Sequence, residues 1–262
     1  MLLARVLRLG REGLYLHFKR QVDEAENENL KRFIERRVSG EPLQYILGHQ
    51  EFWSIDMKVD PRVLIPRPET ELLVEQALSI LSGFPKGSTP KILEIGTGSG
   101  AVAVALARET KSLFIVATDI SLEALALARE NAIAAGVLPR INLIRGDLFG
   151  PFRPLKGDGT FDLILSNPPY IGHSEIERLA TGVRDYEPTV ALEGGKDGLA
   201  FHREIVLQAP RYLSKGGWLL LEVGQGQGAE VSEMMEGTGN LLSIQSYRDL
   251  SGIERVVKAQ SK

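Results

Sequence analysis

The chain has 262 residues, of which 43% are hydrophobic and 25% charged, and its formal net charge is -3. A chain of this length can bury one substantial core plus a small extra module, and its slightly acidic balance argues against a general nucleic-acid-binding surface. Cysteine is absent, which excludes disulfides, thiolate metal sites, iron–sulfur chemistry and any reaction through a cysteine nucleophile.

The histidines and the apolar runs narrow the class further. The four histidines are scattered without the paired spacing of metal ligands, so we expect no metal site. No apolar run approaches the roughly 18 residues that cross a bilayer, and arginines interrupt the start of the chain. We therefore expect a soluble, cytoplasmic protein.

The first 40 residues are predicted to be helical, because apolar residues recur there at helical spacing. Residues 42–66 change to an extended pattern, in which Asp60-Pro61 supplies the turn of a β-hairpin or arm. A helix is predicted from Glu69 through Leu81. We predict a helical domain over residues 1–41, a β-hairpin linker over residues 42–70 and a larger domain over residues 71–262.

The larger domain alternates strands with helices. Strands are predicted at residues 91–95, 113–118, 141–145, 161–166, 218–223, 241–247 and 253–258, and helices at residues 101–108, 201–213 and 228–235. With the last two strands antiparallel, this pattern indicates a doubly wound, Rossmann-like α/β sheet of about seven strands. A long polar stretch before Leu199 is predicted to be a functional loop or a lid.

A glycine turn, Gly96–Gly100, follows the strand at residues 91–95 and precedes an alanine-rich helix. This order is typical of the first βα unit of a nucleotide-binding sheet, because glycine lets the backbone turn sharply and approach a ligand. The third glycine comes one residue earlier than in the dinucleotide fingerprint, and Glu94 stands two residues before the first. Both differences favour S-adenosylmethionine, which has no pyrophosphate. The predicted contacts are Glu94, Gly96, Thr97, Gly98, Ser99 and Gly100.

Asp119 ends the next predicted strand, about 20 residues beyond the glycine turn, where a carboxylate can accept two hydrogen bonds from a ribose diol. Its alternative role is to cap the following helix, but Ser121 is the better cap, so we favour ribose binding. After the third strand, Asp147 could accept from an adenine amino group while Leu148 and Phe149 cover the ring. A loop carboxylate above two core residues explains this string equally well.

Asn167-Pro168-Pro169-Tyr170 directly follows the apolar strand at residues 161–166. Neither proline has an N–H, so the strand ladder ends there and carbonyl groups are left free to accept hydrogen bonds. The Asn167 side-chain oxygen and a backbone carbonyl form two acceptors suited to an NH2 group, and the Tyr170 ring can lie against a flat substrate. This arrangement suits methyl transfer to a planar amide or amine nitrogen. The alternative is a proline turn that caps a strand, with Tyr170 in the core.

Together these motifs resemble the PrmC/HemK family, the glutamine N5-methyltransferases of peptide chain release factors. The matching strings cover nearly the whole chain and lie at residues 41–48, 64–71, 96–100, 147–149, 167–171 and 197–199. Pro66-Arg67-Pro68 joined to Asn167–Tyr170 is far more specific than either string alone. Family members usually carry additional N-terminal helix, so we expect a shortened helical domain here. Leu148 stands where some relatives have tryptophan.

The resemblance implies a class I S-adenosylmethionine-dependent methyltransferase that yields S-adenosylhomocysteine as its product. Its acceptor would be the glutamine of the Gly-Gly-Gln tripeptide in class I release factors, which the domain at residues 1–41 would dock. No membrane and no direct sequence-specific nucleic-acid contact is expected. The predicted catalytic residues are Asn167, Pro168 and Tyr170, with Asn167 also touching the cofactor and with Pro169 and Arg67 as further substrate contacts.

Our hypothesis is that Asn167 Oδ1 and the Pro168 carbonyl accept the two N–H groups of the acceptor amide and aim its nitrogen at the sulfonium methyl group. Arg67 and Glu69 are predicted to order the arm at residues 66–68 or to touch the incoming protein. An interdomain ion pair is the alternative. Glu222, which ends a strand, can be a buried hydrogen-bonding residue and nothing more.

Two other functions fit the same residues. An exocyclic-amine methyltransferase of DNA or RNA can use the same corner and flip its target base out of a duplex. A noncatalytic cofactor-binding module is the second.

Overall fold

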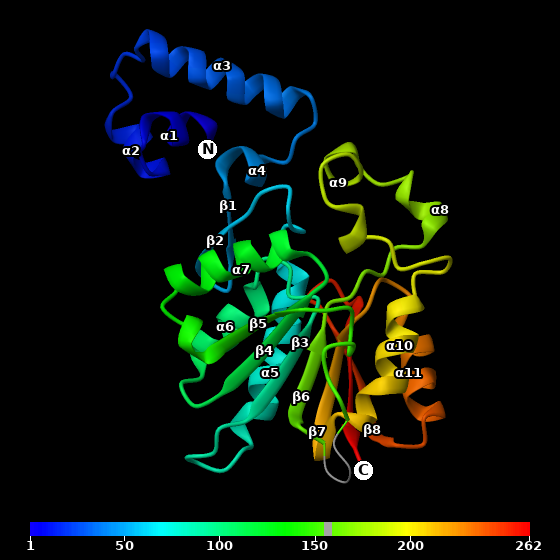
Figure 1. Ribbon diagram of the computed structural model, residues 1–262. Coiled ribbons are helices and arrows are strands. Elements are labelled where there is room, and N and C mark those ends of the chain that lie inside the picture. The colour runs from blue at the N-terminus through cyan, green and yellow to red at the C-terminus, as the bar shows by residue number, and fades with distance from the viewer. Residues whose placement is uncertain (155–158) are drawn as a thin grey trace.

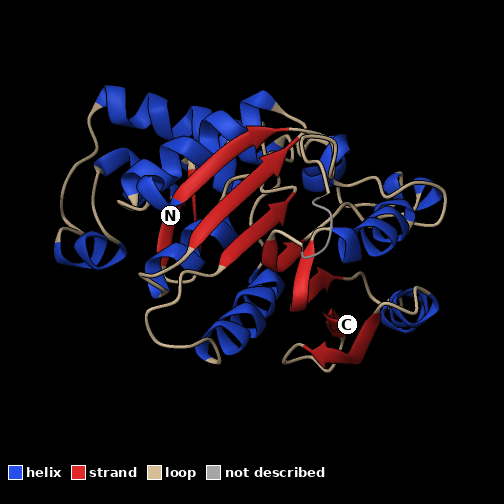
Figure 2. Cartoon of the chain, turned by 60° about the horizontal axis from the view of Figure 1, so that its bottom comes forward, coloured by secondary structure: helices blue, strands red, loops and turns tan. Residues whose placement is uncertain are grey.

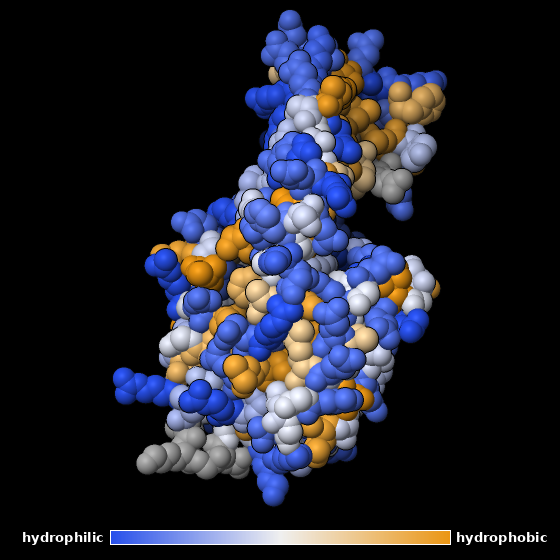
Figure 3. Space-filling model, turned by 90° about the vertical axis from the view of Figure 1, so that its right-hand side faces the viewer, coloured by the Kyte–Doolittle hydropathy of each residue, from blue (hydrophilic) through white to orange (hydrophobic). Residues whose placement is uncertain are grey.

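The computed structural model describes residues 1–154 and 159–262, and Figure 1 shows a small helical lobe above a larger α/β body. The lobe contains α1 (Leu2–Leu7), α2 (Arg11–Leu16) and α3 (Glu24–Val38), as the helical spacing predicts. Asp23 caps α3, since its side chain accepts from the Glu26 N–H and the Glu26 side chain accepts from the Asp23 N–H. In the space-filling view a narrow neck sets this lobe apart from the body (Figure 3).

A β-hairpin links the lobe to the body, but its turn is not where the sequence predicts it. Strands β1 (His49–Phe52) and β2 (Ile55–Lys58) pair antiparallel around Trp53-Ser54, not Asp60-Pro61. Both turn residues have positive φ, 52° and 54°, the backbone of a type I′ turn, which usually needs asparagine or glycine. Tertiary contacts hold this turn, because the Trp53 N–H donates to Glu71 (2.7 Å) and its indole N–H donates to Glu109 (3.0 Å).

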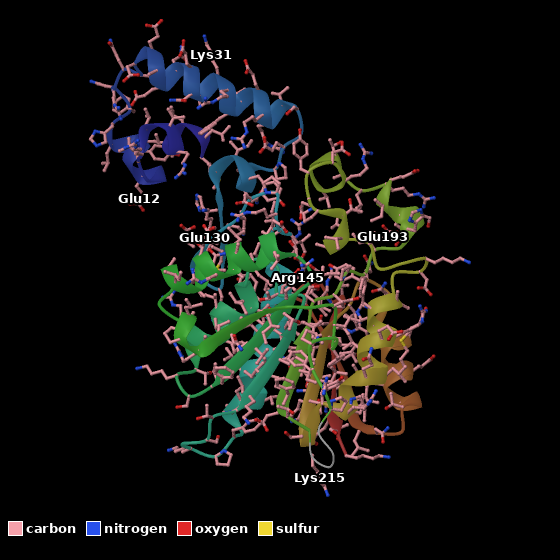
Figure 4. All side chains as sticks on the ribbon, viewed as in Figure 1. Glu12, Lys31, Glu130, Arg145, Glu193 and Lys215 are labelled. Carbon is pink, nitrogen blue, oxygen red and sulfur yellow. The ribbon has the colours of Figure 1, made fainter. Side chains whose placement is uncertain are left out.

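The rest of residues 42–66, which the sequence predicts to be extended, is only partly extended in the structure. A short helix, α4 (Leu43–Leu47), begins after Pro42 and ends at Gly48, whose φ of 80° stops it. Residues 63–65 pair with no strand of the described chain. The hairpin rests on the body, where Lys58 pairs with Glu130, which Figure 4 places at the top of the body beneath the hairpin.

The body is built on a seven-stranded sheet in the order β5-β4-β3-β6-β7-β9-β8. Its strands are β3 (Lys91–Ile95), β4 (Phe114–Asp119), β5 (Ile141–Arg145), β6 (Phe161–Ser166), β7 (Leu213–Glu222), β8 (Leu241–Arg248) and β9 (Glu254–Ser261). The first five strands of this set are parallel, and β9 runs antiparallel to both β7 and β8. The doubly wound sheet and its antiparallel closing pair are as predicted.

Helices cover both faces of the sheet (Figures 1 and 2). The longer ones are α5 (Glu71–Ser82), α6 (Ala101–Glu109), α7 (Leu122–Ala134), α10 (Ala200–Gln208) and α11 (Gly228–Gly237). The first three pack on one face and the last two on the other, so successive residues of a central strand enter opposite cores, as Ile92 and Leu93 do. Burial on both faces explains why these strands are continuous apolar runs. None of the described helices is both long and apolar enough to cross a bilayer.

The long polar stretch after β6 forms a separate segment with only short helices. They are α8 (His173–Ile176), α9 (Thr181–Arg184) and the 3-10 turn Thr189–Ala191. The Tyr186 hydroxyl of this segment donates to the main-chain carbonyl of Ser39 (3.0 Å), just beyond α3. The segment therefore bridges the lobe and the carboxyl edge of the sheet.

The order of the strands places the site. The chain moves outward from β3 through β4 to β5 and then returns to β6 on the other side of β3. At such a switch point the loops after two neighbouring strands separate and leave a crevice at their carboxyl ends. The glycine turn follows β3 and the Asn167 corner follows β6, so the two motifs are neighbours.

Candidate active site

Two cavities lie at this crevice. The larger cavity has a volume of about 170 Å³ and is lined by the glycine turn, the ends of β4 and β5, the Asn167 corner and the arm before α5. The smaller cavity has a volume of about 90 Å³. It is lined by Leu64, Arg67, Asn167, Pro168, Tyr170, Ile171, Val183, Ala191 and Leu192. Asn167 and Pro168 line both cavities, so the corner stands between them.

The glycine turn forms one wall of the larger cavity. Its backbone is held to β4, since the N–H groups of Gly96 and Thr97 both donate to the Thr118 carbonyl (2.9 and 2.8 Å). Gly100 has a φ of 80°, and a Cβ there would lie 3.0 Å from the Ala128 Cβ. The third glycine of the turn is therefore required for α6 to pack against α7.

Glu94 is a buried carboxyl at the end of β3 that lines the same cavity. The Thr97 hydroxyl donates to its Oε2 (2.7 Å). Burial raises the pKa of Glu94 to about 8, and the negative charge of Asp119 nearby acts in the same direction. A cationic ligand group in this cavity would stabilise the carboxylate form.

Asp119 lines the cavity from the end of β4 and also supports the glycine turn. Its Oδ2 accepts from the Gly98 N–H (2.8 Å) and its Oδ1 from the Ser121 N–H (3.0 Å), which leaves further lone pairs on both oxygens. The helix cap is Ser121, as predicted, because its hydroxyl accepts from the Ala124 N–H (3.1 Å). Burial raises the pKa of Asp119.

The string after β5 divides between the cavity and the core. Asp147 and Leu148 line the larger cavity, and Leu148 has a positive φ of 46°. This left-handed residue reverses the chain and turns Phe149 into the core, where its ring stacks on Tyr212 at a centroid distance of 4.6 Å. Phe149 lines neither cavity, and its core position is the alternative that the sequence left open for this residue.

Asn167 presents its side-chain oxygen as an acceptor because its nitrogen is already engaged. Asn167 Nδ2 donates to the Thr70 hydroxyl (3.1 Å), at the turn that precedes α5. No group of the described residues donates to the Pro168 carbonyl. The corner therefore offers two hydrogen-bond acceptors between the cavities, and Pro169 lines the larger one beside them.

Tyr170 lines the smaller cavity and is fixed through its backbone. Its main-chain carbonyl accepts from Gln227 Nε2 (2.9 Å), which precedes α11. Burial raises the pKa of the phenol to about 12, so the side chain is a neutral, flat wall at physiological pH.

Arg67 lines both cavities and forms an ion pair with Glu187. The Glu187 side chain is 1% exposed and also accepts from the Ile65 N–H (3.3 Å), so it ties the arm to the segment that carries α9. The sequence left an ion pair and a contact with an incoming protein as alternatives, and the ion pair is present. Glu69, by contrast, is exposed.

The sequence of this chain matches two family models and is similar to those of known proteins. The family model "PrmC N-terminal domain" matches residues 1–48, and the model "Methyltransferase small domain" matches residues 71–182. A release factor glutamine methyltransferase of Geobacter sulfurreducens is 45% identical over 98% of this chain and 86% of its own length. One from Bradyrhizobium diazoefficiens is 38% identical over 99% of this chain and 86% of its own length. The chain belongs to the release factor glutamine methyltransferase family.

The fold of this family member also occurs among more distant enzymes. A methyltransferase from Pyrococcus furiosus is 18% identical, with a TM-score of 0.53 over 89% of this chain and 98% of that one. At that identity the likeness concerns the fold alone.

Several residues that build the site of this release factor glutamine methyltransferase family member are not predicted from the sequence. Thr70, Glu187 and Gln227 each hold a predicted residue in place through a side-chain hydrogen bond or ion pair. Thr70 lies in the same motif as Arg67, at residues 64–71, and this position is the one signal in the sequence for its role. Glu187-Pro188 in a long polar loop is a weak signal for a buried carboxylate.

Proposed function

We propose that this chain transfers a methyl group from S-adenosylmethionine to the side-chain amide nitrogen of the glutamine in the Gly-Gly-Gln motif of class I peptide chain release factors. The observation that carries the proposal is the Asn167–Pro168 corner, which offers two acceptors between two cavities. Membership in the release factor glutamine methyltransferase family supports the same acceptor.

The residues of the larger cavity fit S-adenosylmethionine. Asp119 has lone pairs left for a ribose diol, and the buried Glu94 carboxyl suits the ammonium group of the methionine part. Asp147 can accept from the adenine amino group, with Leu148 against the ring. When bound, S-adenosylmethionine supplies an electrophilic methyl group on a sulfonium sulfur.

The corner would orient and activate the acceptor nitrogen. An amide nitrogen is a weak nucleophile, because its lone pair is delocalised into the carbonyl. Asn167 Oδ1 and the Pro168 carbonyl would accept its two N–H groups and fix the direction of attack. The same oxygens would stabilise the positive charge that grows on this nitrogen, which is the role of an oxyanion hole with the signs reversed.

The smaller cavity would receive the acceptor side chain and select it. Tyr170 would lie along the amide plane, and Arg67, which lines both cavities, would contact the incoming chain. Two acceptors at the corner satisfy an NH2 group but repel a carboxylate, so glutamine is favoured over glutamate.

The helical lobe would dock the body of the release factor. Exposed apolar side chains gather on it, with Tyr15, Leu16 and Val38 each at least 80% exposed. The apolar patches on this lobe are visible in Figure 3. Exposed apolar surface of this kind marks protein interaction sites.

Mass measurement on a release factor tests the proposal. The protein is incubated with isotope-labelled S-adenosylmethionine and an intact class I release factor, or with bulk RNA or DNA. We expect one methyl group on the peptide that contains Gly-Gly-Gln and none on a factor with glutamate at that position. Label on nucleic acid alone would show an exocyclic-amine methyltransferase instead, and label on no substrate would show a cofactor-binding module.

A further inference from the structure

Glu222 is a buried carboxyl directly behind the corner. In the parallel pairing of β6 with β7, Ser166 lies opposite Leu221, which places Asn167 beside Glu222 at the next position. Glu222 is only 1% exposed and lines neither cavity. It therefore acts on the reaction only through its neighbours.

The surroundings of this carboxyl include one buried oxygen without a partner. The side chains of Thr70 and Asn167 interact with it as hydrogen-bonding groups, whereas its Oε2 has no partner among the described residues. Its main-chain carbonyl accepts from His202 Nε2 (2.8 Å). The other charged or titratable groups that face Glu222 are Arg255 on β9, Glu69 before α5, and Tyr170.

The direction of the hydrogen bonds among Glu222, Thr70 and Asn167 depends on the charge of Glu222. A threonine hydroxyl can either donate or accept, so Thr70 alone does not decide which end of the Asn167 amide faces it. A carboxylate only accepts. An ionised Glu222 would accept from the Thr70 hydroxyl and from the Asn167 amide. The Thr70 lone pairs would then face Asn167, whose Nδ2 donates to Thr70 Oγ1 (3.1 Å).

We infer that Glu222 is a positioning residue, which fixes the Asn167 amide with its nitrogen toward Thr70 and its oxygen toward the acceptor nitrogen. This inference rests on the proposed function and adds the group that sets its specificity. With a donor in place of the carboxylate, the hydroxyl can reverse, the amide can rotate, and an N–H group would then meet the acceptor NH2.

A pH dependence follows from the protonation of this group. Burial raises the pKa of Glu222 to about 7, although Thr70, Arg255 and Asn167 act to lower it. Below this value the protonated carboxyl can donate to Thr70, and the amide of Asn167 loses its fixed orientation. Turnover of the wild-type protein is therefore expected to rise as the pH increases through this range.

The test compares Glu222→Gln with wild type on a short Gly-Gly-Gln peptide. We expect kcat to fall about tenfold to a hundredfold, as is typical of a misplaced reacting group, while the cofactor dissociation constant changes less than about threefold. The rise of kcat with pH should disappear. Inhibition by a Gly-Gly-Glu peptide should become stronger, because a rotated amide can donate to a carboxylate. Glu233→Gln, at an exposed position of α11, is the control and should leave kcat and its pH profile unchanged.

The substitutions Thr70→Ser and Thr70→Val provide a second, independent pair. Serine keeps the hydroxyl and should retain most of the turnover, whereas valine should lose it as Glu222→Gln does. This pair decides the question if Glu222→Gln unfolds. Equal turnover for serine and valine, or a Glu222→Gln protein with wild-type kcat and pH profile, would refute the positioning role. If the wild-type protein fails to methylate an intact release factor as well, the proposed function itself fails.

Discussion

At the scale of single residues, the site depends on a few groups whose hydrogen-bonding capacity is only partly used. Asn167 has its nitrogen engaged and its oxygen available, and the Pro168 carbonyl has no donor in the described chain. Asp119 likewise accepts a backbone hydrogen bond on each carboxylate oxygen and has further lone pairs available. Protein contacts therefore orient the groups that are proposed to bind ligand.

Replacing Asn167 measures what this orientation contributes. Asn167→Ala removes one of the two acceptors, and we expect kcat to fall about 100- to 1,000-fold, as on removal of one oxyanion-hole donor. Asn167→Asp should fall at least as far, because it places a second carboxyl beside buried Glu222. Stopped-flow or steady-state methylation of a Gly-Gly-Gln peptide gives kcat, and calorimetry gives cofactor affinity.

The exposed Asn142 on β5 supplies a matched control, and Asn142→Ala should leave kcat unchanged. Near-normal turnover of Asn167→Ala with intact cofactor binding would remove the acceptor role from this residue.

How far the sequence predicts a site residue depends on how local its partners are. Asp119 and its Ser121 cap are neighbours in the chain, so both roles follow from the local string. Thr70 lies 97 positions from Asn167, and Glu187 lies 120 positions from Arg67. Such pairs are created by the fold, and no local pattern carries them.

At the scale of elements, the same distinction separates the sheet from the hairpin. The central strands of the body are apolar runs bounded by turn residues, and the sequence predicts all seven strands to within a few positions except for the early start of β7 at Leu213. The hairpin turn at Trp53-Ser54 has no glycine or asparagine to indicate it. It is held by Glu71 and Glu109, which come later in the chain. Local sequence patterns alone therefore favour Asp60-Pro61 as the turn.

Helix α7 offers a test at this scale, because its first turn carries Ala124 into the larger cavity. Ser121→Ala removes the hydroxyl that accepts from the Ala124 N–H, and the expected loss of stability is about 1 kcal/mol. Thermal unfolding should show a lower Tm, while Ser121→Asp, which keeps an acceptor, should stay near wild type.

Ser79→Ala, at an exposed position inside α5, controls for loss of a serine hydroxyl and should not lower Tm. A Ser121→Ala protein as stable as wild type would mean that the cap contributes nothing to α7.

At the scale of the whole molecule, the segment with α9 connects the helical lobe to the smaller cavity. The segment with α9 contributes Val183, Ala191 and Leu192 to the smaller cavity, and it contacts the lobe through Tyr186 and Ser39. Its Glu187 also holds Arg67. If the lobe binds the release factor, this segment sets the distance between the docking surface and the corner.

Gly40 lies at the contact between the lobe and this segment and allows that distance to be tested. It has a φ of 99°, and a Cβ there would lie 2.9 Å from the Thr181 Cγ2, so Gly40→Ala must shift Thr181 or the lobe at this contact. We expect KM for an intact release factor to rise about tenfold, equivalent to roughly 1.4 kcal/mol, because both contacts can no longer form together. KM for a short Gly-Gly-Gln peptide, which needs only the corner, should change less than about twofold.

Gly136→Ala separates this effect from backbone strain. Gly136 also has a positive φ, 69°, but a Cβ there meets nothing within 4 Å, so Gly136→Ala has a conformational cost of about 1–2 kcal/mol without a steric clash. Only Gly40→Ala should raise KM for the intact factor more than KM for the peptide. A rise in KM of equal size for both substrates would place the disturbance in the smaller cavity itself. No rise for either would show that the lobe does not need its contact with α9 to present the release factor to Asn167.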